Sequence, residues 1–239
     1  MRAEAYAEMA ALEERHWWFR GRRAVIGALL SRAGVRPPVR LLDAGCGTGG
    51  NLRAFGHLGP SEGVDDAQEA VDVCHARGLT QVRRGTLDAL PHDDGAFGLL
   101  LATDVLEHID DDVAALRELR RVAAPGAVLV VTVPAQPWLW SAHDEALHHR
   151  RRYRRRELVD RAREAGWAPE VVTGFNVVLL APIALARLAR RGADGTDHDA
   201  TPPSLDRVLV QPLRLEARLV ARGLDLPPGV SLGLALRAA

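Results

Sequence analysis

The chain contains no lysine: all 31 of its basic residues are arginines, and they balance 31 acidic residues to a formal net charge of zero. A neutral chain is a poor general binder of nucleic acid or of anionic membranes, because both rely on excess positive charge. The absence of lysine also excludes a Tyr-x-x-x-Lys dehydrogenase set. We attribute the all-arginine composition to codon bias in a GC-rich genome, so an arginine here carries less information than elsewhere.

Cysteine and long apolar runs are also scarce. Two cysteines, Cys46 and Cys74, give no disulfide framework and indicate a reducing, cytoplasmic setting. The first 19 residues lack an uninterrupted apolar segment, so we expect no signal peptide. No stretch reaches the ~20 apolar residues that a membrane span needs. With 47% hydrophobic residues in a chain of 239, one large α/β domain with a sizeable core is expected.

Glycine, by contrast, is concentrated in one stretch. Residues 39–51 read VRLLDAGCGTGGN, in which a short apolar run predicts a buried strand that ends at Asp43. Apolar residues resume at helical spacing from Leu52. Glycines between a strand and a helix let the backbone approach a ligand closely. We therefore predict that Asp43, Gly45, Cys46 and Gly47 bind a nucleotide-like cofactor.

The glycines alone fit two kinds of cofactor. Gly45, Gly47 and Gly50 satisfy the dinucleotide pattern GxGxxG. Asp43 argues against a dinucleotide, because its carboxylate would repel a pyrophosphate at the following helix N-terminus. The same carboxylate favours a ligand that carries an ammonium and a sulfonium.

An acid about twenty residues beyond the glycine loop predicts a ribose contact. Asp65 ends a short predicted strand over residues 62–65, and Asp66 competes for the same role. A carboxylate at this spacing can accept from both ribose hydroxyls. It serves either cofactor and does not choose between them.

The segment DAGCGTG at residues 43–49 resembles the acidic-glycine signature of class I S-adenosylmethionine (SAM) methyltransferases. Two more segments resemble that family: Leu90-Pro91, and DVLEHI at residues 104–109, after a predicted strand over 97–104. HWWF at residues 16–19 and WSAHDEALHHRRRY at residues 140–153 resemble a small-molecule subgroup of it. The resemblance covers residues 13–160 and resumes at the C-terminus.

The resemblance implies SAM as cofactor and a Rossmann-like, doubly wound sheet of seven strands with a terminal antiparallel pair. It assigns Asp43 and the glycine loop to the methionine part, Asp65 to the ribose, and Thr86 with Leu87 to the adenine. Asp104 belongs to the carboxyl end of the fourth strand, where ligands bind. Thr86 replaces an aspartate that many members carry, and Gly98 replaces another after Phe97, so looser adenine recognition is expected.

The predicted domain organisation has four parts, arranged as a core with helical additions. Two helices over residues 3–33, broken near Gly21, form the lid. An apolar helix over 176–191, a polar break over 192–204 and a helix over 205–222 form an insertion, which caps the substrate site or forms a dimer contact. The parts are an N-terminal helical lid (1–36), a SAM-binding core (37–175) with an active-site loop (134–153), the cap insertion (176–228) and a final strand (229–239).

The aromatic end of the first predicted helix has two interpretations. Trp17 and Trp18, with His16 and Tyr6 beside them, can staple the helix to the core. Alternatively they line a substrate pocket, since aromatic faces supply apolar area and attract a cationic sulfonium. We list all four residues as candidate substrate contacts.

The loop over residues 134–153 is too long and polar for a simple connection, which is typical of functional loops. His143, paired with Asp144 or another acid, is a candidate general base. His143, Asp144 and His148 are also an N/O ligand set for a divalent metal, but their spacing matches no standard zinc motif and no metal is expected. The third alternative is a polar loop that binds substrate by hydrogen bonds. The candidate substrate contacts here are Trp140, Asp144, His148, Arg152 and Tyr153.

His108 is a second tentative catalytic residue, four positions after Asp104. It can touch substrate if the helix begins there, but DVLEHI recurs in relatives with different substrates, which favours a structural role.

Arginines occupy six of the seven positions from 150 to 156, with Tyr153 between them, and the run ends at a predicted helix start. Cations at a helix N-terminus oppose the helix dipole. They indicate an anionic substrate group, protein acids such as Glu157, or a solvated helix start; one basic run in a neutral chain is weak evidence for RNA.

These observations predict an enzyme that transfers the methyl group of SAM to a hydroxyl, amine or carbon of a small, possibly anionic acceptor. A nicotinamide-dependent oxidoreductase and a non-catalytic SAM-binding module are the alternatives, and an RNA methyltransferase is the variant within the class. We expect no nucleic-acid partner and no transmembrane segment. The apolar insertion allows a homodimer and, more weakly, a lipid-linked substrate at a membrane surface.

Overall fold

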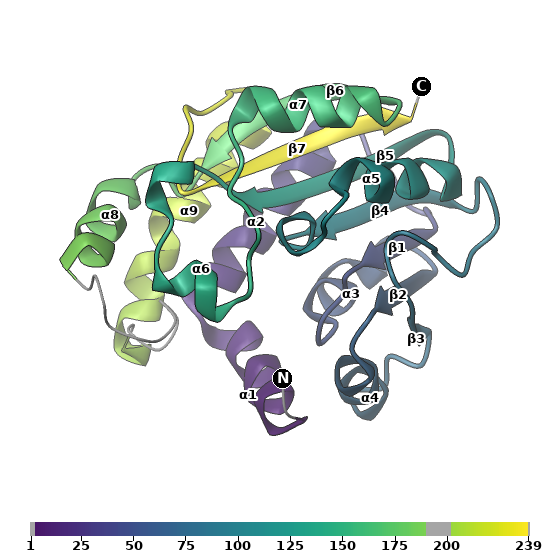
Figure 1. Cartoon of the computed structure of the whole chain (residues 1–239), viewed down its shortest axis with the longest axis horizontal. Helices are drawn as coiled ribbons and strands as arrows, with labels where there is room; N and C mark the ends of the chain where they lie inside the picture. The colour runs from purple at the N-terminus through teal and green to yellow at the C-terminus, as the bar shows by residue number, and fades with distance from the viewer. Residues whose placement is uncertain (1–2, 190–201, 239) are drawn as a thin grey trace.

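The computed structural model describes residues 3–189 and 202–238. Seven strands form one sheet in the order β3-β2-β1-β4-β5-β7-β6 (Figure 1). The first five pair in parallel, and β7 lies antiparallel between β5 and β6. The predicted doubly wound sheet with a terminal antiparallel pair is therefore confirmed. The strands are β1 Leu41–Ala44, β2 Ser61–Asp65, β3 Val82–Arg84, β4 Phe97–Thr103, β5 Ala123–Pro134, β6 Trp167–Phe175 and β7 Ser231–Ala238.

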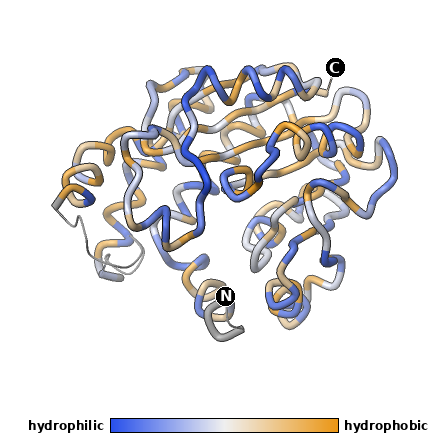
Figure 2. Tube along the Cα trace, in the orientation of Figure 1, coloured by the Kyte–Doolittle hydropathy of each residue, from blue (hydrophilic) through white to orange (hydrophobic). Residues whose placement is uncertain are grey.

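Helices cover both faces of the sheet, which explains why the central strands are apolar on both sides. Successive strand residues point to opposite faces. Leu42, Leu100 and Leu129 pack with α5 and α7 on one face. Leu41 and Leu99 pack with α2, α3, α4 and α9 on the other. Figure 2 shows the central strands as largely hydrophobic tubes. These helices are α2 Trp17–Arg32, α3 Gly50–Phe55, α4 Gln68–Ala76, α5 Asp112–Val122, α7 Arg155–Glu164 and α9 Asp206–Ala221.

Three further helices, α1 Ala3–Arg15, α6 Ala142–Ala146 and α8 Leu180–Ala189, lie beyond the carboxyl ends of the parallel strands (Figure 1). This is the edge of an open α/β sheet where ligands bind.

The prediction that the N-terminal helices break near Gly21 is wrong: the break falls at His16, between α1 and α2. His16 has extended backbone and its ring accepts a hydrogen bond from the Trp18 N–H at 3.3 Å, as an N-cap residue does. The Trp17 N–H donates to Asp206 Oδ1 at 3.0 Å, so the first residue of α9 also holds this helix start. The aromatic residues thus begin the second helix and do not end the first.

Gly21 instead lies inside α2, where it serves close packing. An added Cβ would lie 2.3 Å from Leu213 Cδ2 and 2.7 Å from Leu213 Cβ, so α9 crosses α2 at this glycine. This contact packs α9, from the C-terminal part of the chain, against α2, from its N-terminal part.

The predicted helical insertion lies between β6 and β7. Its second helix, predicted over residues 205–222, is observed as α9. The first helix starts later than predicted, because Asn176 adopts a left-handed conformation with φ 57°. The buried Glu216 carboxylate of α9 accepts the N–H groups of Asn176, Val177 and Val178 at 2.5–3.0 Å. Residues 190–191 of the predicted helix and residues 192–201 of the predicted break lie outside the described residues. Among the described helices, none has the length and apolar character to cross a membrane.

Substituting the two glycines of α2 tests this packing. Gly21→Ala should destabilise the protein by about 1–3 kcal/mol, because the methyl group has no room against Leu213. Gly27→Ala is the matched control, since its Cβ would meet nothing within 4 Å, and it should stabilise the helix by about 0.5–1 kcal/mol. Urea unfolding of both variants gives the comparison. Equal effects of the two substitutions would contradict the proposed helix contact.

Candidate active site

The glycine loop after β1 has a backbone that only glycine adopts readily. Gly45, Gly47 and Gly49 have φ of 75°, 52° and 80°. A Cβ on Gly45 would lie 2.4 Å from Val105 Cγ2, so this residue packs against the segment after β4. A Cβ on Gly47 would point into open space, with nothing within 4 Å. Gly47 therefore offers a surface that a ligand can approach closely.

Asp43 lies at the base of this loop with a fully buried side chain. No hydrogen bond with ordinary distance and angles reaches either carboxylate oxygen within the described part of the chain. Burial raises the pKa of Asp43 to about 7, although the nearby charge of Arg22 and the Asn51 amide act in the opposite direction. Burying a carboxylate with so little compensation is costly, and a cationic ligand group would offset that cost. The ammonium of an amino acid moiety fits this environment.

Asp65 connects the glycine loop to the end of β2. The Gly47 N–H donates to Asp65 Oδ2 at 2.8 Å, and the Ala67 N–H donates to Oδ1 at 3.1 Å. Burial raises the pKa of Asp65, and these two N–H groups partly counteract the shift. Asp66 is exposed at the next position. The carboxylate thus lies directly beside the glycine loop, and its contact with a ribose remains a prediction.

The other residues predicted to contact the cofactor surround the same loop. Cys46 is buried with its sulfur near that of Cys74, and this contact, followed by burial, raises the Cys46 pKa well above its usual value. Thr86 is exposed just after β3, whereas Leu87 is buried in the core on the face of the sheet that α5 and α7 cover.

Helix α1 contacts the glycine loop, a contribution that the sequence did not indicate. The Thr48 hydroxyl donates to Glu13 Oε2 at 2.5 Å, and Arg77 donates to the Thr48 carbonyl at 2.5 Å. Tyr6 lies on the same side: burial, and then the charges of Asp65 and Asp66, raise its pKa. Tyr6 is therefore near the predicted ribose site and is not part of the pocket described next.

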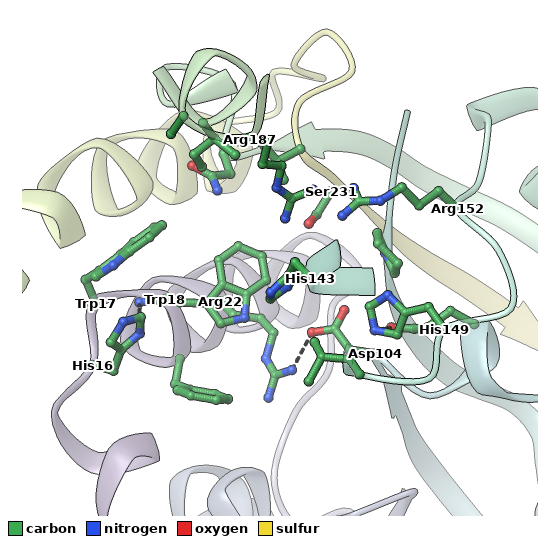
Figure 3. A pocket seen from close by; sticks show the side chains of 18 of the residues that line it. His16, Trp17, Trp18, Arg22, Asp104, His143, His149, Arg152, Arg187 and Ser231 are labelled. Atoms are coloured by element: carbon green, nitrogen blue, oxygen red, sulfur yellow. Dashed lines mark hydrogen bonds and ion pairs between the residues drawn. The ribbon is translucent and has the colours of Figure 1, made fainter. Parts of the chain in front are cut away.

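A pocket of about 400 Å³ opens next to this region. Trp17 and Trp18 of α2 lie on one side, His149 and Arg152 approach from the opposite side, and Arg187 of α8 lies above (Figure 3). Phe19 of α2 also lines the pocket. Trp18 is held by stacking on Phe175, with ring centroids 5.7 Å apart. The other lining residues are Met9, His16, Arg22, Asp104, Glu107, His108, Pro134, His143, Leu147, Asn176, Ile183, Ala186, Val230 and Ser231.

An ion pair between Arg22 and Asp104 lies at the floor of the pocket (Figure 3). Asp104 follows β4 with a left-handed backbone, φ 52°. Its other oxygen accepts from the Thr132 hydroxyl of β5 at 3.1 Å. Arg22 was not predicted to belong to the site, because one arginine among 31 gives no signal in the sequence.

The loop over residues 134–153 is held in place by a buried ionic cluster around Asp144. Asp144 Oδ1 accepts from Arg152 Nε at 2.7 Å and from His149 Nδ1 at 2.9 Å. Burial alone would raise the pKa of Asp144, but the bonds from His149 and Arg152 outweigh it and lower the pKa to about 2. The side chain of Asp144 is fully buried behind the pocket wall and is absent from its lining.

The residues predicted to contact substrate divide into two groups. Those in the pocket lining are His16, Trp17, Trp18 and Arg152, together with the two candidate catalytic residues His108 and His143. Tyr6, Trp140, Asp144, His148 and Tyr153 lie elsewhere. Trp140 and His148 are exposed, and Tyr153 is fully buried, its hydroxyl donating to Asp112 Oδ2 at 2.6 Å. The roles assigned to all of them remain predictions.

The cluster of histidines and acids that could bind a metal consists of other residues than those predicted from the sequence. In the described ranges, the group that could hold a metal is Glu107, His108 and His149, not His143, Asp144 and His148. Glu107 was not a candidate in the sequence, because its neighbour His149 lies far along the chain.

Much of the arginine run is paired with protein acids. Arg150 pairs with Asp110, Arg151 Nη1 lies 3.3 Å from Asp112, and Arg152 binds Asp144. These pairs compensate the charges on the loop itself, which weakens the case for an RNA contact.

Comparisons with known proteins agree with this geometry. Residues 42–131 match a family model described as a methyltransferase domain. A malonyl-[acyl-carrier protein] O-methyltransferase of Halorhodospira halophila is 32% identical over 238 residues, covering 89% of this chain and 74% of that protein. A norajmaline N-methyltransferase of Rauvolfia serpentina is 34% identical over 108 residues, covering 40% of this chain and 36% of that protein.

The chain spans about a third of the length of the first curated relatives that it matches. Among solved structures, an S-adenosylmethionine-dependent methyltransferase of Mesorhizobium loti aligns with a TM-score of 0.58 at 18% identity, covering 90% of this chain and 97% of that one. This likeness establishes the fold.

Removing the Tyr153 hydroxyl separates a structural role from substrate contact. Tyr153→Phe should lower the free energy of unfolding by about 1–3 kcal/mol, because Asp112 loses a buried donor. The affinity for substrate should stay unchanged, since the Tyr153 side chain lies outside the pocket lining. Chemical unfolding and calorimetric binding measure the two effects. Weakened ligand binding with unaltered stability would instead support substrate contact.

Proposed function

Because the chain belongs to the family of S-adenosylmethionine-dependent methyltransferases, we propose that it methylates a hydroxyl oxygen of a small acceptor bound in the pocket beside Asp104. The predicted cofactor, SAM, is confirmed by this membership, and it supplies a methyl group activated on a positively charged sulfur. The protein then has to bind, orient and deprotonate the acceptor, and alignment alone can lower the barrier substantially.

Around the glycine loop, three features support a site for this cofactor. The buried Asp43 carboxylate offers a partner for the ammonium, and Asp65, already held by the Gly47 N–H, offers one for the ribose. Thr86 and Leu87 are the proposed adenine contacts. Asp104 lies between this region and the pocket, so the reactive end would face the acceptor side.

The observation that carries the proposed acceptor class is the mixed lining of the pocket. Trp17, Trp18 and Phe19 supply apolar surface, and His143 and His149, whose ring centroids lie 6.3 Å apart, supply imidazoles. Small-molecule sites commonly combine such an apolar lining with a few placed polar groups. A compact, largely apolar molecule with a hydroxyl group matches this arrangement.

His143 of α6 is the proposed general base. It lines the pocket on a short helix whose start is capped by Ser141 and Asp144, so its backbone is well anchored. A neutral imidazole can take the proton of an acceptor hydroxyl as the oxygen attacks. The proton then resides on an imidazole nitrogen, from which solvent can remove it after the product leaves.

Arginines in the lining favour an acceptor with an anionic or oxygen-rich group. Arg22, Arg152 and Arg187 all border the pocket, against the carboxylates of Asp104 and Glu107. Guanidinium groups already engaged by protein acids can still donate from their other N–H groups. The name of the Halorhodospira relative, an O-methyltransferase, agrees with an oxygen acceptor.

The affinity for S-adenosylhomocysteine should depend on pH through Asp43. In the free protein the pKa of Asp43 is about 7, and a bound ammonium should lower it, so binding releases a proton. Affinity should therefore rise with pH, by up to about tenfold per unit below pH 7, and level off above it. Isothermal titration calorimetry between pH 5.5 and 8.5, the range on either side of about 7, measures the slope. Asp43→Asn should bind more weakly at pH 8 and show a flat profile; a flat wild-type profile would contradict the ammonium contact.

Replacing His143 tests the general base. His143→Ala should lower kcat for hydroxyl acceptors by about 10²- to 10⁴-fold, because no side chain then takes the proton. The affinity for S-adenosylhomocysteine should be unchanged. His57→Ala, at an exposed position outside the pocket, is the control. Full activity of His143→Ala on hydroxyl acceptors, or activity confined to amines in both proteins, would exclude this role.

A further inference from the structure

We propose that Glu107, His108 and His149 form a binding site for a divalent first-row transition-metal ion on the wall of the acceptor pocket. One ligand atom from each of the three side chains lies within 4.8 Å of the others. Glu107 and His108 belong to the turn Leu106–His108 after β4, and His149 lies in the loop over residues 134–153. All three residues border the pocket.

The side chain of Glu107 provides the strongest argument that a cation binds here. Its side chain is fully buried, and both carboxylate oxygens lack a hydrogen-bond partner among the residues described here. Burial, followed by the charge of Asp104, raises the pKa of Glu107 well above its usual value, while Arg22 and Arg152 oppose the shift. Buried carboxylates are normally paired or coordinate metals. A bound dication would satisfy both oxygens.

His149 is oriented as a metal-binding histidine is. Its Nδ1 donates to the buried Asp144 carboxylate at 2.9 Å, so that in the neutral imidazole the lone pair is on Nε2. That Nε2 lies 4.0 Å from Glu107 Oε1. Metal-bound histidines almost always donate their second nitrogen to a carboxylate or carbonyl in this manner, which fixes the tautomer and the ring orientation. The cluster around Asp144 therefore has a use beyond anchoring the loop.

The backbone keeps the two parts of the site together. The Arg150 N–H donates to the Glu107 carbonyl at 2.8 Å, and Arg150 Nε donates to the His108 carbonyl at 2.8 Å. The rings of His108 and His149 lie 4.9 Å apart between centroids. These contacts use main-chain atoms and Arg150 and take up no side-chain atom of the three proposed ligands. The His108 ring also forms a hydrogen bond with the His148 backbone, which leaves its second nitrogen for an ion.

The donor set indicates which ions would bind. Two imidazoles and one carboxylate suit Zn²⁺, Fe²⁺, Mn²⁺ and Co²⁺, whereas Mg²⁺ prefers oxygen ligands. Bonds of about 2.0–2.2 Å bring ligand atoms to roughly 3–3.5 Å from one another. The side chains therefore have to close by about 1 Å around an ion. Three protein ligands leave coordination positions open toward the pocket, as catalytic metal sites do.

A metal ion here would act on the acceptor. It could bind the hydroxyl oxygen and lower its pKa, so that His143 takes the proton more easily. The imidazole of His143 lies 6.3 Å from that of His149 between centroids. This use rests on the proposed function, but the binding of the ion does not.

The test uses the full-length protein after removal of metals with a chelator, without cofactor or acceptor. Zn²⁺ binding is measured by calorimetry and Co²⁺ binding by visible absorption. We expect one ion per chain, competition between Zn²⁺ and Co²⁺, and no binding of Mg²⁺ at the same concentrations. Glu107→Gln and His149→Ala should each weaken Zn²⁺ binding at least 100-fold, and His57→Ala should leave it unchanged.

Thermal melting keeps the test valid if a variant folds poorly. Glu107→Gln removes a buried carboxyl group whose ionisation is disfavoured by burial, so its metal-free form should melt at or above the wild-type temperature, and added Zn²⁺ should no longer raise the melting temperature. Asp144→Asn should weaken binding by about 10- to 100-fold, since it only orients His149. Absence of Zn²⁺ and Co²⁺ binding, or binding that Glu107→Gln leaves intact, would overturn the proposal. Because neither SAM nor acceptor is present, such a result would leave the methyl-transfer proposal standing.

Discussion

This site depends on the ion pair that the buried Arg22 side chain forms with Asp104. Arg22 lies on α2 with an exposed fraction of only 8%, and it forms an ion pair with Asp104. Its charge also lowers the pKa values of Asp43 and Glu107 against the effect of burial. One carboxylate of β1 and two from the segment just after β4 are thus influenced by a single guanidinium. Without it, their mutual repulsion and burial would oppose the approach of β1, β4 and the turn after β4.

The same ion pair separates two regions with different chemistry. On one side, the glycine loop presents free space at Gly47 beside the Asp65 carboxylate. On the other, the aromatic wall of α2 faces the histidines of the turn after β4 and of the loop over 134–153. A reaction between a bound cofactor and a bound acceptor needs this kind of adjacency, with each ligand held by its own residues. The helical additions complete the acceptor side: Arg187 of α8 donates to the Leu139 carbonyl of the loop at 3.1 Å.

Local signals in the sequence located the strands and the glycine loop, and the family resemblance supplied the topology of the sheet. Asp43 argued against a dinucleotide, and the choice of a SAM-type loop rested on Asp43 together with the resemblance of Leu90-Pro91 and of DVLEHI at residues 104–109 to the methyltransferase family. The break between the first helices was misplaced, because Gly21 reads as a helix breaker until Leu213 of α9 is known to pack there. Such a contact joins distant parts of the chain and has no local signature.

The acceptor side was harder to predict for the same reason. His143, His108 and the aromatic pair were recognisable by residue type and motif, but Glu107 gains its significance only from His149, which another segment brings to it. Arg22 was hidden by the all-arginine composition. Asp144 looked like a substrate contact because it is an acid in a polar loop, whereas its oxygens accept from Arg152, His149 and the Ser141 N–H. Residue spacing does not tell which charges within such a loop compensate one another.

The central claim is that the cofactor and the acceptor lie on opposite sides of the Arg22–Asp104 pair. A crystal structure of the complex with S-adenosylhomocysteine tests it most directly. The account predicts the ribose on Asp65, the amino group near Asp43, and the sulfur directed toward the pocket lined by Trp18. S-adenosylhomocysteine bound within the aromatic pocket itself, or with no contact to Gly47 and Asp65, would contradict it.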